Sequence, residues 1–194
     1  MVILLPIFIE LWYFNRYNIS VLVIESLIGG IIIQSSMTTC CFTGHRRIPP
    51  EAVAPLRERL EAEIESLIRQ GVRYFGAGGA LGFDTLAAEA VLDLKAVYPF
   101  IRLILVLPCR DQTRGWAEED VKRYQAILKR ADKVVYTAER YTSGCMYKRN
   151  RHLAEHSDCC LCYLTENSGG TFYTVGLCRR RGIPVRNLAE PAPK

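Results

Sequence analysis

The sequence lacks the features that mark disordered, fibrous and disulfide-stapled proteins. Only 23% of its 194 residues are charged, 49% are hydrophobic, and it contains no internal repeat or low-complexity segment. These proportions are ordinary for a folded domain, so a disordered or collagen-like chain is excluded. Eight cysteines are present, but scaffolds held by disulfides are usually shorter, and several of these cysteines lie inside apolar runs. We therefore expect buried thiols in a reducing cytoplasm.

A strong excess of charge of one sign is also missing. Lys and Arg number 25 against 20 Asp and Glu, which gives a formal net charge of +5. This balance permits a polyanionic partner without requiring one, because the basic residues must also gather on one face. No run of basic residues alternates with stacking aromatics, so nucleic acid is the less favoured partner.

The first 36 residues lack both the basic start and the small-residue cleavage site of a secretory signal. Glu10, Arg16 and Glu25 interrupt an otherwise apolar segment, whereas a membrane-spanning helix needs about 20 predominantly apolar residues. Three interpretations compete for residues 1–36: a weak membrane segment, an extra hydrophobic hairpin, or upstream DNA translated from a misassigned start. We favour the third, because Met37 lies two residues before the first convincing strand. Without the segment, 158 residues with a net charge of +6 remain.

From Met37 onward the hydrophobic period switches repeatedly between that of a strand and that of a helix. Strands are expected at Thr39–Thr43, Val72–Gly76, Ile101–Leu107, Lys133–Tyr136, Cys159–Leu164 and Pro184–Arg186. A first helix is opened by Pro49 and closed by Gly71, and further helices are expected at Phe83–Ala96, Trp116–Lys129, Met146–His156 and Thr171–Arg181. The apolar stripe of the first helix comprises Val53, Leu56, Leu60, Ile64, Leu67 and Ile68. The alternation predicts a Rossmann-like, three-layer α/β domain with an open, mainly parallel sheet over residues 37–190, followed by a tail at 191–194.

Candidate binding residues are expected beyond the carboxyl ends of the strands, where helix N-termini present free N–H groups. The loop after the first strand contains Gly44, His45 and Arg46. Glycine permits a sharp turn there, and the arginine is suited to a phosphate. A plain turn with a surface arginine is the simpler alternative, and we favour the phosphate site over it.

The loop after the second strand holds four glycines within residues 76–82. Gly78, Gly79 and Gly82 let the backbone approach a ligand closely, and Asp84 suits either a ribose hydroxyl or the cap of the following helix. Leu81 stands where the dinucleotide fingerprint requires glycine, and the loop has no lysine of the P-loop type. A standard Rossmann dehydrogenase and a Walker ATPase are therefore both disfavoured.

Two further strand ends carry weaker signals. After the third strand, Trp116 offers a flat surface for a base, against a core or lid role that is at least as well supported. Cys109 lies beside Arg110 and would have a lowered thiol pKa there, but no base is evident, so a nucleophile is disfavoured. After the fifth strand, the loop with Gly169, Gly170 and Thr171 resembles a phosphate cradle.

The helix at 146–156 carries Arg149 and His152 on roughly one face. The alternative is a solvent-exposed basic face, because a run of charged residues on a helix usually indicates one. Cys159, Cys160 and Cys162 follow on a strand, but the sequence has no paired C-x-x-C knuckle. We therefore expect no metal site and treat these cysteines as buried thiols.

The motifs at these strand ends resemble the YpsA-type branch of the SLOG superfamily, which also includes LOG-type phosphoribohydrolases and the DNA-processing protein DprA. The resemblance covers about Thr39 to Asn187 and rests on Cys41–Arg46, Gly78–Asp84 with Ala87-Ala88-Glu89, Leu107-Pro108-Cys109 with Gln112 and Trp116, Gly144-Cys145-Met146 with Arg149-Asn150-Arg151, and Gly169-Gly170-Thr171. It implies a Rossmann-like domain that binds nucleotides or nucleotide-derived ligands through the strand-end glycine loops. Asn150 joins the candidate site on this ground.

The sequence departs from the LOG pattern at the catalytic carboxylate. Met146-x-x-Arg149 fits the LOG element M-x-x-R-K, with Asn150 in place of the lysine. In the second LOG element, P-G-G-x-G-T-x-x-E, the aligned Gly, Thr and Glu positions hold Phe172, Tyr173 and Gly176. Without that glutamate an oxocarbenium-like transition state loses its electrostatic partner, and only Glu89 or Asp84 is left as a candidate substitute.

We therefore expect a cytoplasmic, bacterial nucleotide-ligand sensor or adaptor without strong catalysis. The alternatives are a LOG-like hydrolase that cleaves the N-glycosidic bond of a nucleotide or NAD-derived ligand, and DprA-like binding of single-stranded DNA. AMP, ADP-ribose and NAD-derived molecules are the candidate ligands, and no cofactor is certain. A homo-oligomer and a protein partner remain open, and a membrane partner is expected only if residues 1–36 are real.

Overall fold

The computed structural model describes residues 11–14, 20–26, 30–35 and 37–189, and the chain divides into two compact units, 1–37 and 38–194. In the first unit, strands β1 (Leu11–Phe14), β2 (Ser20–Ser26) and β3 (Gly30–Ser35) pair antiparallel in that order. Glu10, Arg16 and the tail at 191–194 lie outside the described residues. No helix in the described part of the chain is both long and apolar enough to cross a membrane. The start of the domain at Met37 stays a prediction.

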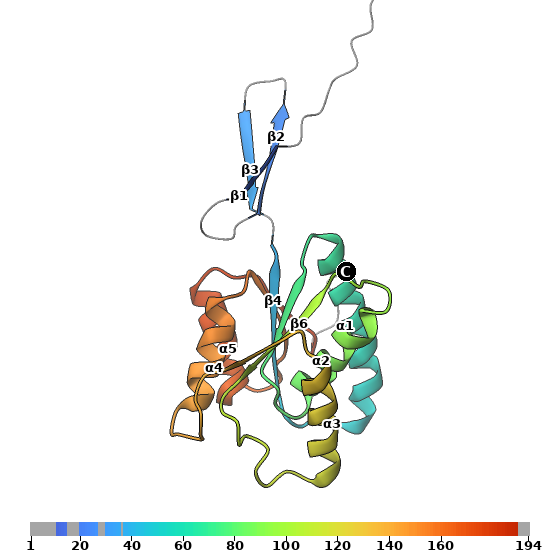
Figure 1. Cartoon of the computed structure of the whole chain (residues 1–194), viewed down its shortest axis with the longest axis vertical. Helices are drawn as coiled ribbons and strands as arrows, with labels where there is room; N and C mark the ends of the chain where they lie inside the picture. Colours follow the sequence, from blue (N-terminus) through green and yellow to red (C-terminus); the bar gives the residue numbers. More distant parts are fainter. Residues whose placement is uncertain (1–10, 15–19, 27–29, 36, 190–194) are drawn as a thin grey trace, which may run out of the picture. The chain divides into compact units, whose positions relative to one another are not determined.

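The second unit is built on a parallel sheet of six strands (Figure 1). The strands are β4 (Thr39–Gly44), β5 (Tyr74–Ala77), β6 (Arg102–Leu107), β7 (Lys133–Tyr136), β8 (Cys159–Tyr163) and β9 (Val185–Asn187). Their order across the sheet is β7-β6-β5-β4-β8-β9, and every neighbouring pair is parallel. The predicted Rossmann-like α/β fold is confirmed.

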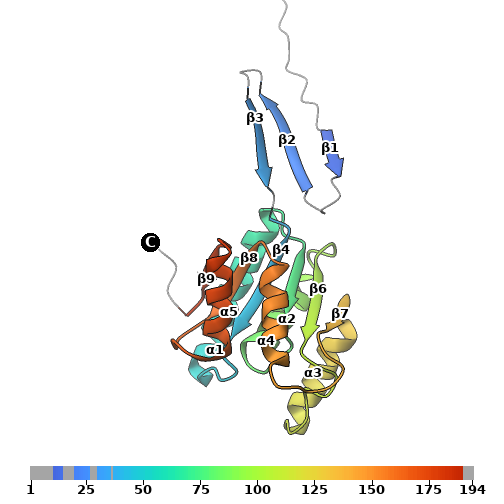
Figure 2. The ribbon, with the colours of Figure 1, turned by 90° about the vertical axis from the view of Figure 1, so that its left-hand side faces the viewer.

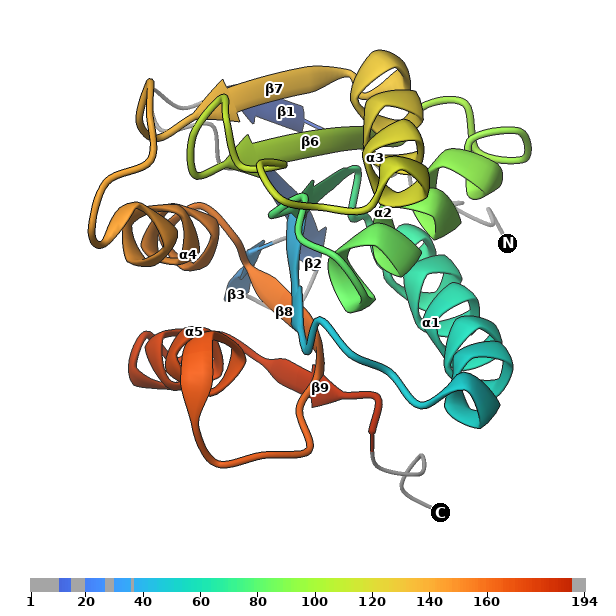
Figure 3. The same cartoon turned by 90° about the horizontal axis from the view of Figure 1, so that it is seen from below.

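Five helices cover the two faces of this sheet. They are α1 (Pro50–Arg69), α2 (Phe83–Leu94), α3 (Glu118–Arg130), α4 (Cys145–Glu155) and α5 (Gly169–Arg180). Figure 3 shows α1, α2 and α3 on one face and α4 with α5 on the other, and Figure 2 views the sheet from the side of α4 and α5. The predicted strands and helices begin and end within two residues of these bounds.

The chain reverses its direction across the sheet at β4. From β4 it proceeds through β5 and β6 to β7, then returns to form β8 on the other side of β4. Two loops therefore leave neighbouring strand ends in opposite directions, and such a switch point is where parallel sheets leave room for a ligand. The structure thus selects the carboxyl ends of β4 and β8 as the place to look for a site.

The core is apolar on both faces of the sheet, but the stripe predicted for α1 is one residue too long. Leu56, Leu60 and Ile64 are fully buried, whereas Val53 is 37% exposed. Burial along α1 begins only at Leu56, and residues 50–55 before it are mostly exposed. Periodicity identifies the face of a helix, but it does not tell where along its length the helix meets the sheet.

The loop after β4 and the start of α2 approach each other so closely that only glycine fits between them. Gly82 has φ +74° and ψ −120°, outside the range that other residues adopt readily. A Cβ at this position would overlap the backbone carbonyls of His45 and Arg46. The Phe83 N–H donates to the His45 carbonyl at 3.1 Å, which ties the two segments together.

We expect Gly82→Ala to lower the free energy of unfolding by about 3 kcal/mol or more, since backbone strain of about 1–3 kcal/mol adds to a clash with backbone atoms. Gly115→Ala is the matched control: Gly115 also has positive φ, +81°, but a Cβ there would meet nothing within 4 Å. Its cost should be only about 1–2 kcal/mol. Urea unfolding of the two variants measures the difference, and equal costs would contradict the close approach.

Candidate functional site

A cavity of about 420 Å³ lies at the switch point between the ends of β4 and β8. Eight of the residues predicted from the strand-end motifs line it: Gly44, His45, Arg46, Asp84, Arg149, Asn150, Gly170 and Thr171. The fold thus brings together residues from the loops predicted after the first, second and fifth strands and from the helix predicted at 146–156.

The other lining residues were not singled out from the sequence as site residues. They are Phe42, Thr43, Ala80, Met146, Tyr147 and Leu153. Met146, Arg149, Asn150 and Leu153 recur at spacings of three and four, so one face of α4 forms a wall of the cavity. That spacing, applied to the helix predicted at 146–156, would have found Leu153.

Arg149 is the centre of the site because its charge is almost fully buried. The residue is 6% exposed, and its Nη1 donates to the Gly78 carbonyl and lies 3.4 Å from the Asp84 Oδ2. The Arg149 Nε is buried and has no hydrogen-bond partner in the described part of the chain. Buried guanidinium N–H groups are normally satisfied, so this atom needs an explanation.

Asp84 supplies the opposite charge from the first turn of α2. Its carboxylate is 5% exposed and accepts a hydrogen bond from the Ala80 N–H at 3.4 Å. Burial raises the pKa of Asp84, and the positive charge of Arg149 opposes that rise. Burial likewise lowers the pKa of Arg149, and the Asp84 carboxylate opposes that change. Each charge therefore offsets part of the cost of burying the other.

The glycines of the second loop shape the cavity from behind rather than line it. A Cβ on Gly78 would occupy the place of the Arg149 guanidinium. Gly79 has φ +65°, and its carbonyl accepts a hydrogen bond from the Gln112 Nε2 at 2.9 Å. The run of glycines thus makes room for the arginine side chain and turns the chain into α2.

Helix α5 begins at the cavity without a side-chain cap. Gly170 and Thr171 of its first turn line the cavity, and Gly169, with φ +79°, lies at the turn beside it. The Gly170 carbonyl accepts hydrogen bonds from the Asn150 Nδ2 at 3.4 Å and the Thr174 Oγ1 at 2.8 Å. The first N–H groups of an uncapped helix are suited to an anion.

His45 holds the first loop in place instead of presenting a free ring. Its backbone N–H donates to the Tyr163 carbonyl at 3.3 Å, and its Nε2 accepts the Thr165 N–H at 3.0 Å. The contact with the Thr165 N–H fixes the orientation of the ring. His45 thereby joins the loop after β4 to the loop after β8.

Trp116 and Cys109 do not take part in this cavity. Trp116 is half-buried and packs edge-to-face on Tyr124, with 5.6 Å between ring centroids. Cys109 is fully buried, and burial raises its pKa to about 11. The hypothesis of a lowered pKa at Cys109 is therefore wrong, because the strand end lies in the core and not beside solvated cations.

An aromatic surface lies instead on α4 and α5. Tyr147 lines the cavity, is 55% exposed, and meets the Tyr173 ring edge-to-face with 4.9 Å between centroids. A second, wider hollow of about 660 Å³ is lined by Arg110, Asp111, Arg114, Glu139, Arg140 and Tyr141. It contains none of the residues predicted for the site.

The fold and its strand-end cavity define the class: a Rossmann-like domain with its hollow at the topological switch point. The chain belongs to the YpsA family, because the family model YpsA, described as the YspA SLOG family, matches residues 44–180. The chain is 34% identical to a UPF0398 protein of Halalkalibacterium halodurans over 118 residues, which cover 60% of this chain and 62% of that protein. It is 29% identical to a UPF0398 protein of Bacillus thuringiensis over 130 residues, 66% of this chain and 71% of the relative.

Solved structures of DNA processing protein A share the fold. The Helicobacter pylori protein, known for a single-stranded DNA binding mode, matches with a TM-score of 0.57 and 21% identity, over 77% of this chain and 64% of its own. The Streptococcus pneumoniae protein matches with a TM-score of 0.56 and 16% identity, over 77% of this chain and 49% of its own. The structural genomics target TM1055 matches with a TM-score of 0.51 and 17% identity, over 77% of this chain and 72% of its own.

Replacing Arg149 by methionine should make the stability depend on pH through Asp84. Without the cation, the Asp84 pKa rises further above its ordinary value of 3.8, so the folded state binds a proton that the unfolded state releases. The free energy of unfolding then falls as pH rises from about 4. At pH 7 we expect a loss of about 3–5 kcal/mol relative to the parent protein, part of which is recovered in acid.

Urea unfolding between pH 4 and 8 measures this effect. The double variant Arg149→Met with Asp84→Asn serves as the control, since it removes the titrating carboxyl and should lose the additional pH dependence. If the single variant followed the pH profile of the parent protein, the ion pair would not control the charge of Asp84.

Proposed function

We propose that the cavity binds the phosphate of a nucleotide or nucleotide-derived ligand and that the protein acts as a sensor or adaptor without strong catalysis. The observation that carries this proposal is the buried Arg149 Nε, for which none of the described residues supplies a hydrogen-bond partner. Leaving such a group unsatisfied costs free energy, and a phosphate oxygen is the strongest acceptor for a guanidinium. Arg149 lines the cavity, so a ligand held in the cavity lies next to the Arg149 side chain.

The charge of the cavity supports an anionic ligand. Among its lining residues, Arg46 and Arg149 are positive and only Asp84 is negative. The uncapped first turn of α5 adds backbone N–H groups with a partial positive charge. The volume of about 420 Å³ falls within the range of small-molecule sites. AMP, ADP-ribose and NAD-derived molecules are the candidate ligands.

Base stacking is better assigned to Tyr147 than to Trp116. Tyr147 lines the cavity with more than half of its surface exposed, whereas Trp116 packs on Tyr124. An exposed aromatic ring beside a phosphate site offers its face to a nucleobase. The ligand would then extend from Arg149 to Tyr147, which lies closer to the start of α4.

The arrangement of carboxylates argues against strong catalysis. Gly176 stands at the LOG glutamate position and does not line the cavity. Glu89, one candidate substitute, is paired with Arg123 of α3 and does not line the cavity. Asp84 is the one carboxylate among the lining residues, and Arg149 already neutralises it.

LOG-like hydrolysis of an N-glycosidic bond is the second candidate, and it depends on Asp84. Burial raises the pKa of this carboxyl, as in general acids of glycoside-cleaving enzymes. DprA-like binding of single-stranded DNA is a third candidate, supported by the shared fold and by exposed Tyr147 and Phe172. The burial of all eight cysteines, as small hydrophobic side chains of the core, supports the cytoplasm as the compartment.

The test is Arg46→Ala with Arg47→Ala as its matched control. Both side chains are exposed and adjacent, but only Arg46 lines the cavity. Loss of a charged hydrogen bond of about 1.5–3 kcal/mol should raise the Kd for AMP or ADP-ribose about tenfold to a hundredfold. Arg47→Ala should leave the Kd unchanged. Isothermal titration calorimetry measures both.

Chromatography of the same mixtures distinguishes the candidate functions. Ligand recovered intact supports the sensor, and release of free base at a rate abolished by Asp84→Asn supports the hydrolase. Binding of an oligonucleotide but of no mononucleotide would support the DprA-like candidate. Equal affinity of the two arginine variants would remove Arg46 from the site.

A further inference from the structure

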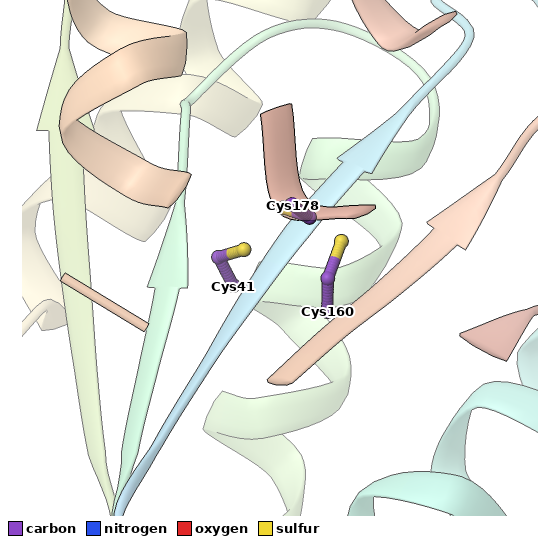
Figure 4. Close-up of side chains that lie close together, drawn as sticks. All are labelled: Cys41, Cys160 and Cys178. Carbon is purple, nitrogen blue, oxygen red and sulfur yellow. The ribbon is translucent and has the colours of Figure 1, made fainter. Parts of the chain in front are cut away.

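Three cysteines meet in the core on the face of the sheet that α4 and α5 cover. The Sγ atoms of Cys41, Cys160 and Cys178 all lie within 4.8 Å of one another. Cys41 and Cys178 are fully buried, and Cys160 is 1% exposed. Figure 4 shows the three side chains with their sulfur atoms turned toward a common space between β4, β8 and α5.

The parallel pairing of β4 and β8 creates this cluster. Cys41 is directly opposite Cys160, so both side chains point to the same face of the sheet. Cys40 and Cys159 are also opposite each other, one residue earlier, and therefore point to the other face. Cys178, in the last turn of α5, completes the group from above the sheet.

We propose that Cys41, Cys160 and Cys178 form a binding site for a thiophilic divalent metal ion of the Zn²⁺ type. Zinc binds thiolate sulfur at about 2.3 Å, which places three ligand sulfurs about 4 Å apart around one ion. The sulfur atoms already lie within 4.8 Å of one another, so binding requires movements of less than about 1 Å. Thiolates select zinc and other soft ions over magnesium or calcium.

The charges around the cluster support such an ion. The positive charge of Arg181 interacts with the Cys178 sulfur. Binding releases the thiol protons: three thiols and M²⁺ give a tris-thiolate complex of charge −1 and three H⁺. Arg181 offsets that single negative charge.

The spacing of cysteines along the chain gives no sign of this site. Cys160 lies in a C-C-x-C run on a strand, where neighbouring side chains point to opposite faces, and Cys178 is in a different element. Only the pairing of β4 with β8 and the packing of α5 over them bring the three sulfurs together. Sequence spacing and the apolar runs around the cysteines therefore predict buried thiols and no more.

The test titrates the full, reduced chain with Co²⁺ or Cd²⁺ as spectroscopic probes and with Zn²⁺ in competition. We expect one equivalent to bind with a thiolate-to-metal charge-transfer band, which Zn²⁺ abolishes by displacement. Cys178→Ala and Cys41→Ser should each weaken binding by more than about 100-fold, beyond the loss seen when a supporting group is removed. Cys40→Ser and Cys159→Ser, on the opposite face of the same strands, should leave the affinity and the band unchanged.

Circular dichroism of each variant without metal identifies any variant that fails to fold. Cys160→Ala replaces Cys178→Ala or Cys41→Ser if one of them is unfolded. Absence of a charge-transfer band in the parent protein would overturn the proposal. An equal loss of affinity in the cluster variants and in the opposite-face controls would overturn it as well.

Discussion

The buried ion pair between Arg149 and Asp84 is the constraint on which the site depends. It joins α4 to the first turn of α2, across 65 residues of sequence. Gly78 must be glycine because the guanidinium occupies the space of its Cβ, and the same arginine donates to the Gly78 carbonyl. Removing one partner of a buried ion pair leaves the charge of the other uncompensated. Arg149, Asp84 and the loop at Gly78 are therefore tied to one arrangement.

The sheet topology gives that ion pair its place. The chain reverses direction at β4, so the loops after β4 and β8 leave neighbouring strand ends and diverge. His45 bridges these two loops by bonds to Tyr163 and Thr165. On the same two strands, the face turned toward α4 and α5 carries the cysteine cluster. One strand pair therefore organises both the cavity at its end and the thiols along its length.

The fold could be predicted from the sequence because hydrophobic periodicity and glycine positions are local signals. Strand-end motifs also identified most of the cavity, since parallel strands place their carboxyl ends at one edge. What the sequence could not give is contact between elements: which aromatic ring faces the cavity, or that Cys178 meets Cys41. The sequence indicates Trp116 as the stacking residue, and only packing reveals that Tyr147 lines the cavity instead. The prediction of a lowered pKa at Cys109 is wrong because its burial depends on the packing of the whole sheet.

The central claim is that the Arg149 side chain holds an anionic ligand, and nuclear magnetic resonance of the arginine Nε–H groups tests it most directly. The Arg149 signal is assigned by its loss in Arg149→Met. Titration with AMP or ADP-ribose should move this signal in a saturable way, because the Nε–H gains a phosphate acceptor, while the signals of Arg123 and Arg57, held in ion pairs elsewhere, stay unchanged. A nucleotide that binds without moving the Arg149 signal, or no nucleotide that binds at all, would contradict the account.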